Sequence, residues 1–207
     1  MAADTEFEPV LSYWFGDLDG DLDFPRDRKQ LWWSGGDAID RDIRERFADL
    51  VQEALSGGRS SWAETPRGRL ALVILLDQFQ RSLGRGSPDA FAGDPRALAL
   101  CLEGIDRGHD QGLRPIERSF FYMPMVHAED AEVASRCLDT FGRLAREIKA
   151  CGVPDHPDFL SHAQMHADIV LRFGRYPHRN AILSRPPTPE EEAYLAEGGP
   201  TFGQKKS

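Results

Sequence analysis

The chain has 207 residues, a length suited to one domain that buries roughly 70% of the surface its unfolded chain exposes. Its formal net charge is -9, and a surface of that sign repels nucleic-acid phosphates. We therefore expect a single domain over residues 1–207 and no nucleic-acid partner.

The cysteines and the N-terminal segment bear on the cellular compartment. Three widely spaced cysteines without a Cys-x-x-Cys motif argue against a disulfide framework or a zinc site. The acidic N-terminal segment lacks the basic and apolar regions of a signal peptide, and no apolar run is long enough to span a bilayer. These features predict a cytoplasmic protein without a membrane partner.

The first third of the chain contains two predicted helices. Residues 1–7 are predicted to be a loose tail, and residues 8–15 form a short helix with one apolar side. The acidic segment 17–23 has the composition of a calcium loop but not its spacing, so we interpret it as a solvated loop. A second helix, capped by Asp37, carries apolar residues at helical spacing and ends at Gly57.

The most apolar stretch, residues 69–85, is predicted to form a continuous central helix. Thr65 and Pro66 directly upstream are a favourable N-cap and first helical residue. The one polar stripe of this helix consists of Asp77, Arg81 and Arg85. Because an unpaired buried charge costs several kcal/mol, these side chains must find partners inside the fold.

The middle of the chain continues the helical pattern. Asp94, followed by proline, predicts the N-cap of another helix. The segment 115–130 joins a block of aromatic and methionine residues to Pro124, which bends or ends a helix. Three polar residues follow that break: His127, Glu129 and Asp130. A long helix then extends to about Cys151, and the next begins at Pro157.

The last third contains two helices and a loop rich in hydrogen-bond donors. His162 and His166 lie one turn apart on the first of these helices, and the loop 175–180 follows it. A capping box at Thr188 opens a short last helix, and residues 197–207 are predicted to be a loose tail. No alternating strand pattern occurs, so the sequence predicts an all-α fold of about seven or eight mostly antiparallel helices.

Three long motifs stand out: LALVILLDQFQRSLGRG, RSFFYMPMVHAED and RFGRYPHRNAILSR. Together they resemble the bacterial domain-of-unknown-function family DUF924, and the resemblance extends from Val10 to the capping box at Thr188. It implies a tetratricopeptide-like helical fold and no settled activity. Gln80 stands where the family more often has proline, which predicts the loss of a kink after Phe79.

Several polar side chains are not explained by helix packing, and we expect them to converge where the central helix, the His127 turn and the loop 175–180 meet. The candidate ligand-binding residues are Asp77, Arg81, Arg85, Arg118, Tyr122, Asp130, Arg172, Arg175, His178, Arg179 and Asn180. The candidate catalytic residues are His127, Glu129 and His166. A purely structural role is also open, in which the same charges form a buried network that locks the helices together.

The first functional hypothesis is a pocket that binds a small anionic ligand, and it leaves open whether the protein also acts on that ligand. A guanidinium group binds a carboxylate or a phosphate bidentately. Five arginines exceed the carboxylates that the sequence places near them: Arg81, Arg118, Arg172, Arg175 and Arg179. The sequence leaves the identity of any cofactor open, and no metal-ligating set is assigned.

Two alternatives come from other functional classes. One is a hydrolase, assisted by a metal through pairs such as His162 and His166 or working with His127 and Glu129 as acid and base. The other is a scaffold with a groove for a peptide partner, although the four clustered aromatic residues that could line it are more typical of a core. These aromatic residues are Tyr13, Trp14, Trp32 and Trp33. A nucleophile elbow, a Walker loop and a dinucleotide-binding loop are all missing from the sequence.

Overall fold

The structure, a computed structural model, describes residues 5–18, 20, 24–152 and 156–202. Every regular element in these ranges is helical, which confirms the all-α prediction. The α-helices are α1 Glu8–Phe15, α2 Lys29–Trp33, α3 Asp37–Leu55, α4 Pro66–Val73, α5 Gln80–Leu83, α6 Asp94–Asp106, α7 Pro115–Phe121, α8 Met123–His127, α9 Ala131–Ala150, α10 Phe159–Phe173 and α11 Pro189–Ala196. The tetratricopeptide-like arrangement stays a prediction.

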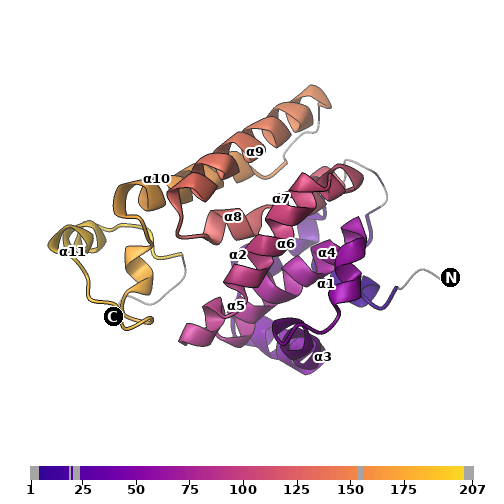
Figure 1. The fold of residues 1–207 in the computed structure, drawn as a ribbon, viewed down its shortest axis with the longest axis horizontal. Helices are drawn as coiled ribbons and strands as arrows, with labels where there is room; N and C mark the ends of the chain where they lie inside the picture. Colours follow the sequence, from indigo (N-terminus) through magenta and orange to yellow (C-terminus); the bar gives the residue numbers. More distant parts are fainter. Residues whose placement is uncertain (1–4, 19, 21–23, 153–155, 203–207) are drawn as a thin grey trace.

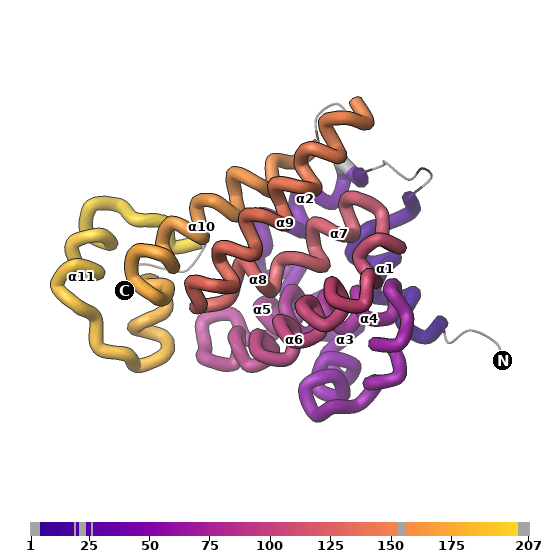
Figure 2. The backbone as a smooth tube through the Cα atoms, turned by 45° about the horizontal axis from the view of Figure 1, so that its top comes forward, coloured from indigo at the N-terminus to yellow at the C-terminus, as the bar shows by residue number. Residues whose placement is uncertain are grey.

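The central helix lies at the middle of the main hydrophobic core. Every residue from Leu70 to Leu76 is 0% exposed, as the unbroken apolar run predicted. Thr65 caps the helix, because its hydroxyl accepts a hydrogen bond from the Gly68 backbone at 3.2 Å. Helices α1, α3, α6 and α7 pack around it (Figures 1 and 2). This packing encloses the polar stripe of the helix.

The predicted helix over 69–85 is confirmed as far as Leu83, but it is not an α-helix throughout. Residues Ile74–Phe79 form a π-helix between α4 and α5, and the Gln80 backbone N–H bonds to the Leu75 carbonyl five residues back. Such widened turns occur mostly as single interruptions, frequently at functional sites. Gln80 therefore follows an irregular turn, and its side chain donates a 2.6 Å hydrogen bond to the Asp89 carbonyl.

Helix α6 approaches the π-helical turn unusually closely. A Cβ atom added at Gly93, directly before α6, would lie 2.1 Å from the Leu76 carbonyl oxygen. Only a glycine fits there, and it brings Asp94 against the central helix. The predicted N-cap at Asp94 is one residue late, because Gly93 occupies the cap and the Asp94 side chain turns inward.

Helices α9 and α10 form an outer pair that runs antiparallel beside the central helices (Figure 2). Asp130 caps α9 by accepting a 2.9 Å hydrogen bond from the Val133 backbone. A second, smaller hydrophobic cluster lies between α9, α10 and the segment after α10. Its buried members are Ala134, Ala167, Ile169, Val170 and Tyr176. Within the described part of the chain, no helix has both the length and the apolar character needed to cross a membrane.

The described ends of the chain are more closely packed than predicted. Phe7, assigned to a loose tail, is buried and contacts the ring of Trp62 at 5.8 Å between centroids. Phe202, assigned to the other loose tail, stacks on His166. The expectations for residues 1–4 and 203–207, and for most of the acidic segment 17–23, lie outside the described residues.

Candidate functional site

Asp77 is the centre of a buried polar cluster. Its side chain is fully buried in the π-helical section of the central helix. Its Oδ1 atom lies 2.7 Å from Nδ1 of His127, at the end of α8, and 3.5 Å from Nη2 of Arg81. Its Oδ2 atom accepts a 2.6 Å hydrogen bond from the Gln78 side chain. Two of the three segments expected to converge therefore meet at this carboxylate.

Asp77 is ionised and His127 is neutral. Burial raises the pKa of Asp77, but the His127 and Arg81 side chains and the hydrogen bond from Gln78 outweigh it and lower that pKa to about 2. Burial and the positive charge of Arg81 lower the pKa of His127, against the attraction of Asp77. Because a carboxylate only accepts hydrogen bonds, Nδ1 carries the imidazole proton and Nε2 carries the lone pair. A neutral imidazole held in this way has the protonation state of a general base.

Asp94 is a site residue that the sequence reasoning missed. Its Oδ1 atom lies 2.7 Å from Nη2 of Arg81, and its Oδ2 atom lies 3.6 Å from Nη1 of Arg179. Burial raises the pKa of Asp94, against the attraction of these two arginines. An Asp-Pro pair at a helix start is ordinarily a cap, so the sequence offered no signal for this inward position.

Arg179 is buried without a hydrogen bond. Its side chain is 6% exposed, and its guanidinium lies between the rings of Phe91 and Tyr176, 4.7 Å and 4.4 Å from their centroids. Among the described residues it has no hydrogen-bond acceptor, and its nearest carboxylate is Asp94 at 3.6 Å. Burial and the positive charge of Arg81 lower its pKa to about 10. The loop after α10 is thus the third segment to join the cluster.

His166 and His178 both contact the Tyr176 ring, and the His166 ring also lies 6.1 Å from the ring of His127. The Tyr176 hydroxyl donates to the Val126 carbonyl and accepts a 3.2 Å hydrogen bond from Nδ1 of His166. Nε2 of His166 and Nδ1 of His178 are buried and have no partner in the described structure. Burial lowers the pKa of both imidazoles, to about 4 for His178 and further for His166. Both rings are therefore neutral at pH 7.

Glu129 holds the loop after α10 in place. Its carboxylate pairs with Arg185 through bonds of 2.5 Å and 3.0 Å and accepts a 2.7 Å bond from the Tyr176 backbone. These contacts outweigh the effect of burial and lower the pKa of Glu129. Arg185 was missed, although it closes the third sequence motif. With both oxygens engaged, Glu129 positions the loop instead of lying free as a base.

Three other candidates fasten α11 to this loop. Arg175 pairs with both oxygens of Glu191, at 2.6 Å and 2.7 Å, and Asn180 donates to the same carboxylate at 3.1 Å. Arg172 lies on the surface and pairs with Glu190. These candidates support the loop from outside the Asp77 cluster.

The remaining candidates lie elsewhere, so the expectation that all of them converge is wrong. Arg85 is on the surface, where it pairs with Asp40. Arg118 pairs with Glu147 and donates to Tyr122, which in turn donates a 2.7 Å bond to Asp110. Asp130 is the cap of α9. Their partners lie on elements that the sequence could not place beside them.

The predicted excess of arginines over carboxylates is not found. All five arginines lie between 2.6 and 3.6 Å from a carboxylate oxygen: Arg81, Arg118, Arg172, Arg175 and Arg179. Arg179 differs from the other four arginines only because its ion pair is longer and more buried. Within the described residues, no three His, Cys, Asp or Glu side chains are placed to hold one metal ion.

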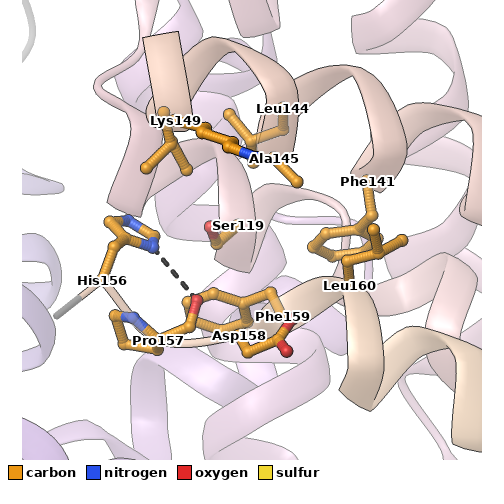
Figure 3. A pocket seen from close by; sticks show the side chains of 11 residues that line it. Ser119, Phe141, Leu144, Ala145, Lys149, His156, Pro157, Asp158, Phe159 and Leu160 are labelled. Carbon is orange, nitrogen blue, oxygen red and sulfur yellow. Dashed lines mark hydrogen bonds between the residues drawn. The ribbon is translucent and has the colours of Figure 1, made fainter. Parts of the chain in front are cut away.

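A cavity of about 280 Å³ opens at the other end of α10, between α7, α9 and the start of α10 (Figure 3). Its walls are mostly apolar, with the Lys149 ammonium and the Ser119 hydroxyl at its edge. His156 borders it and lies 3.1 Å from the Pro157 carbonyl through Nδ1. None of the predicted site residues lines this cavity.

Comparison with known proteins identifies relatives without an assigned function. A family model described as "Bacterial protein of unknown function (DUF924)" matches residues 10–199. A solved structure of a protein of unknown function from Agrobacterium tumefaciens is similar, with a TM-score of 0.78 and 36% sequence identity over 93% of this chain and 97% of that one. No curated protein matches. The match over nearly the whole chain shows that this protein belongs to the DUF924 family of bacterial proteins.

Proposed function

We propose that Arg81 and Arg179 bind a small anion, a carboxylate or a phosphate, between the central helix, the start of α6 and the loop after α10. The observation that carries the proposal is Arg179. A guanidinium has five N–H donors, and leaving buried donors without acceptors costs free energy. Arg179 is 6% exposed, its buried Nε atom has no partner among the described residues, and its nearest carboxylate lies 3.6 Å from Nη1, so a bound anion supplies acceptors that the fold does not.

A second buried arginine in the same chain shows how a structural arginine is satisfied. Arg69 is 1% exposed, and its guanidinium donates to the carbonyls of Ala63 at 3.0 Å and Leu100 at 3.1 Å. It also reaches Nδ1 of His109 at 3.2 Å. The contrast between Arg69 and Arg179 supports a ligand-binding role for Arg179.

The charges of the cluster leave Arg179 free to take an anion. Asp77 and Asp94 both contact Arg81, at 3.5 Å and 2.7 Å, so that arginine is already shared between two carboxylates. Arg179 has only the longer contact to Asp94. An anion that binds Arg179 bidentately forms charge-assisted hydrogen bonds in a desolvated site, where they are strong.

We extend the proposal to a proton transfer by His127. Asp77 holds His127 in the tautomer that leaves the lone pair on Nε2. Arg81 lies close enough to influence the pKa of His127 and the pKa of Asp77. A bound carboxylate or phosphate compound therefore meets a neutral base. The His127→Asn variant tests this extension. We expect it to retain anion binding and to lose turnover of the bound compound.

The interaction scaffold has less support. Trp14 and Trp32 are buried, and Tyr13 is partly buried against Phe47, as residues of a core are. Trp33 is 45% exposed and is the one member of the four aromatic candidates that a partner could contact. A single exposed tryptophan carries no argument for a peptide groove.

The binding test compares two arginine variants with the wild type. We expect phosphate or a small carboxylate to raise the free energy of unfolding of the wild type, by about 2.7 kcal/mol at a hundred times its dissociation constant. Arg179→Met removes this effect, because the fixed donors are lost. Arg172→Met, which changes a surface arginine paired with Glu190, retains it.

Denaturation in urea at several anion concentrations provides the measurement. Equal stabilisation of the wild type and Arg179→Met contradicts the proposal, and so does the absence of any stabilisation by phosphate and carboxylates. Acetate, benzoate and inorganic phosphate are suitable probes, because together they separate carboxylate from phosphate recognition.

A further inference from the structure

Phe202 covers a group of unsatisfied imidazoles next to the proposed anion site. Its ring stacks on His166 with the centroids 3.8 Å apart and the planes 27° apart. The same ring contacts His178 at 5.2 Å and Tyr176 at 6.3 Å. A benzene ring offers these neighbours no hydrogen bond in its plane, so the polar atoms beneath it stay unpaired.

The protonation state of His166 determines which kind of hydrogen-bond partner its Nε2 atom lacks. The Tyr176 hydroxyl donates its proton to the Val126 carbonyl, so it accepts from Nδ1–H of His166. His166 is 4% exposed, and its Nε2 atom is then a bare acceptor without a donor in the described part of the protein. Nδ1 of His178 is a second buried nitrogen without a partner there. Buried polar groups of this kind usually have partners, and two beside one ring call for an explanation.

Tyr176 contacts both the proposed anion site and the ring of Phe202. The guanidinium of Arg179 lies 4.4 Å from the centre of the Tyr176 ring, and the His178 ring lies 5.3 Å from it. His178 and Arg179 are neighbours in sequence, and both contact the Tyr176 ring.

We propose that Phe202 occupies a subsite for a planar ring that carries an N–H or O–H donor, and that this ring belongs to the same ligand whose carboxylate or phosphate binds Arg179. The inference rests on the proposed anion site and names the class of its ligand. The incoming ring takes the place of the Phe202 ring but enters edge-on to His166, because the Nε2 lone pair points outward in the plane of the imidazole, and its donor bonds to Nε2. Phe202 is the occupant in the absence of the ligand.

Phe202 is suited to being displaced. Its ring makes only stacking and edge contacts with its neighbours, and its backbone has a φ of 48°, in the left-handed region that costs a non-glycine residue about 1 kcal/mol. Gly198, with a φ of 97°, precedes it by four residues. A ligand that forms hydrogen bonds with the two imidazoles competes with a residue that forms none.

The test uses neutral ring probes on the full-length chain, so that it does not depend on the anion site. Phe202→Ala vacates the subsite, and we expect it to bind phenol at least tenfold more tightly than the wild type does, measured by calorimetry or ligand-observed NMR. Toluene has nearly the same shape without the donor. In Phe202→Ala/His166→Asn the asparagine amide can still donate to Tyr176, but its shorter side chain places no acceptor where Nε2 lay.

The comparison of phenol with toluene isolates the hydrogen bond. We expect the affinity of phenol relative to toluene to fall by about threefold to tenfold in the double variant, the size expected of one hydrogen bond. Phe202→Ala/His162→Ala is the matched control, because it changes the histidine one turn away on α10, and it retains the preference. Failure of Phe202→Ala to bind phenol, or an unchanged preference in the His166 variant, overturns the ring subsite.

The two proposals fail separately. Phosphate binding that depends on Arg179, together with no phenol binding by Phe202→Ala, overturns the ring subsite and leaves the anion site standing. Phenol binding without any Arg179-dependent anion binding overturns the anion site and with it the ligand that combines both groups.

Discussion

Three histidines with lowered pKa values, one buried and two partly buried, make the cluster sensitive to acid. Burial holds His127, His166 and His178 neutral, and His178 does not take up a proton until the pH falls to about 4. In the unfolded chain each titrates near its ordinary value of about 6.5. Below that pH the unfolded state binds protons that the folded state does not, so stability falls as the pH falls.

We predict that the free energy of unfolding decreases from pH 7 to pH 5. The slope is up to about 1.4 kcal/mol per pH unit for each of these histidines. His166→Asn removes one titrating group and therefore shows a shallower slope than the wild type between these values. Urea denaturation at pH 7, 6 and 5 measures it, and equal slopes for the two proteins contradict the assignment of His166 as a buried neutral imidazole.

The Asp77 carboxylate affects the stability of the protein at lower pH than the histidines do. Its pKa of about 2 in the folded protein is below its ordinary value of 3.8, so the stability that it contributes is present above pH 3.8 and is lost as the pH falls towards 2. The histidine effect comes first on acidification, and the two are separate in pH. The sequence predicted that Asp77, Arg81, His127 and Arg179 need partners, because fixed charges lie next to apolar runs, and the structure places these residues in one cluster.

At the scale of helices, the site depends on the interruption of the central helix. The π-helical turn at Ile74–Phe79 holds Asp77 fully buried, and the close approach of Gly93 to the Leu76 carbonyl brings Asp94 beside Arg81. The apolar run predicted a central helix but not this turn, because no local residue such as proline marks it and its contact with the start of α6 is made only in the folded chain. The same tertiary contact turned Asp94 from an expected cap into a member of the cluster.

We predict that Gly93→Ala destabilises the protein by about 1–3 kcal/mol, the range for an overpacked core, because its Cβ lies 2.1 Å from the Leu76 carbonyl oxygen. It also alters anion binding, since it displaces Asp94, which lies against Arg81 and Arg179. Gly142→Ala is the control: that Cβ meets nothing closer than an Arg146 nitrogen at 3.6 Å, within α9, and alanine favours a helix. Denaturation midpoints and phosphate titrations of both variants are the measurements, and a Gly93→Ala protein as stable as the wild type contradicts this account.

For the whole molecule, helical periodicity was enough to predict the class of fold and nearly all of the helices. The site could be predicted only in part. Its sequence signal was the charge on the central helix and in the loop 175–180, whereas Asp94, Arg185 and Phe202 come from elements whose positions depend on long-range packing. Arg85, Arg118 and Asp130 carried the same kind of signal and proved to have partners elsewhere. Charge in an apolar context predicts that a partner exists, but not which one.

The structural and functional explanations of the cluster differ in one quantity, the stability of the protein without its ligand. If Arg179 locks the loop to α6, its loss destabilises the fold. If it is held in place for an anion, the unliganded protein carries a buried guanidinium without hydrogen bonds, and replacing such a charge by an apolar side chain of similar size is often stabilising.

The most direct test is therefore the free energy of unfolding of Arg179→Met in a buffer free of phosphate and carboxylates. We predict that the variant is as stable as the wild type or more stable, by up to about 3 kcal/mol, while phosphate no longer stabilises it. A loss of about 2 kcal/mol or more without any ligand present would show that Arg179 serves the fold, and would contradict the central claim that this cluster is a binding site.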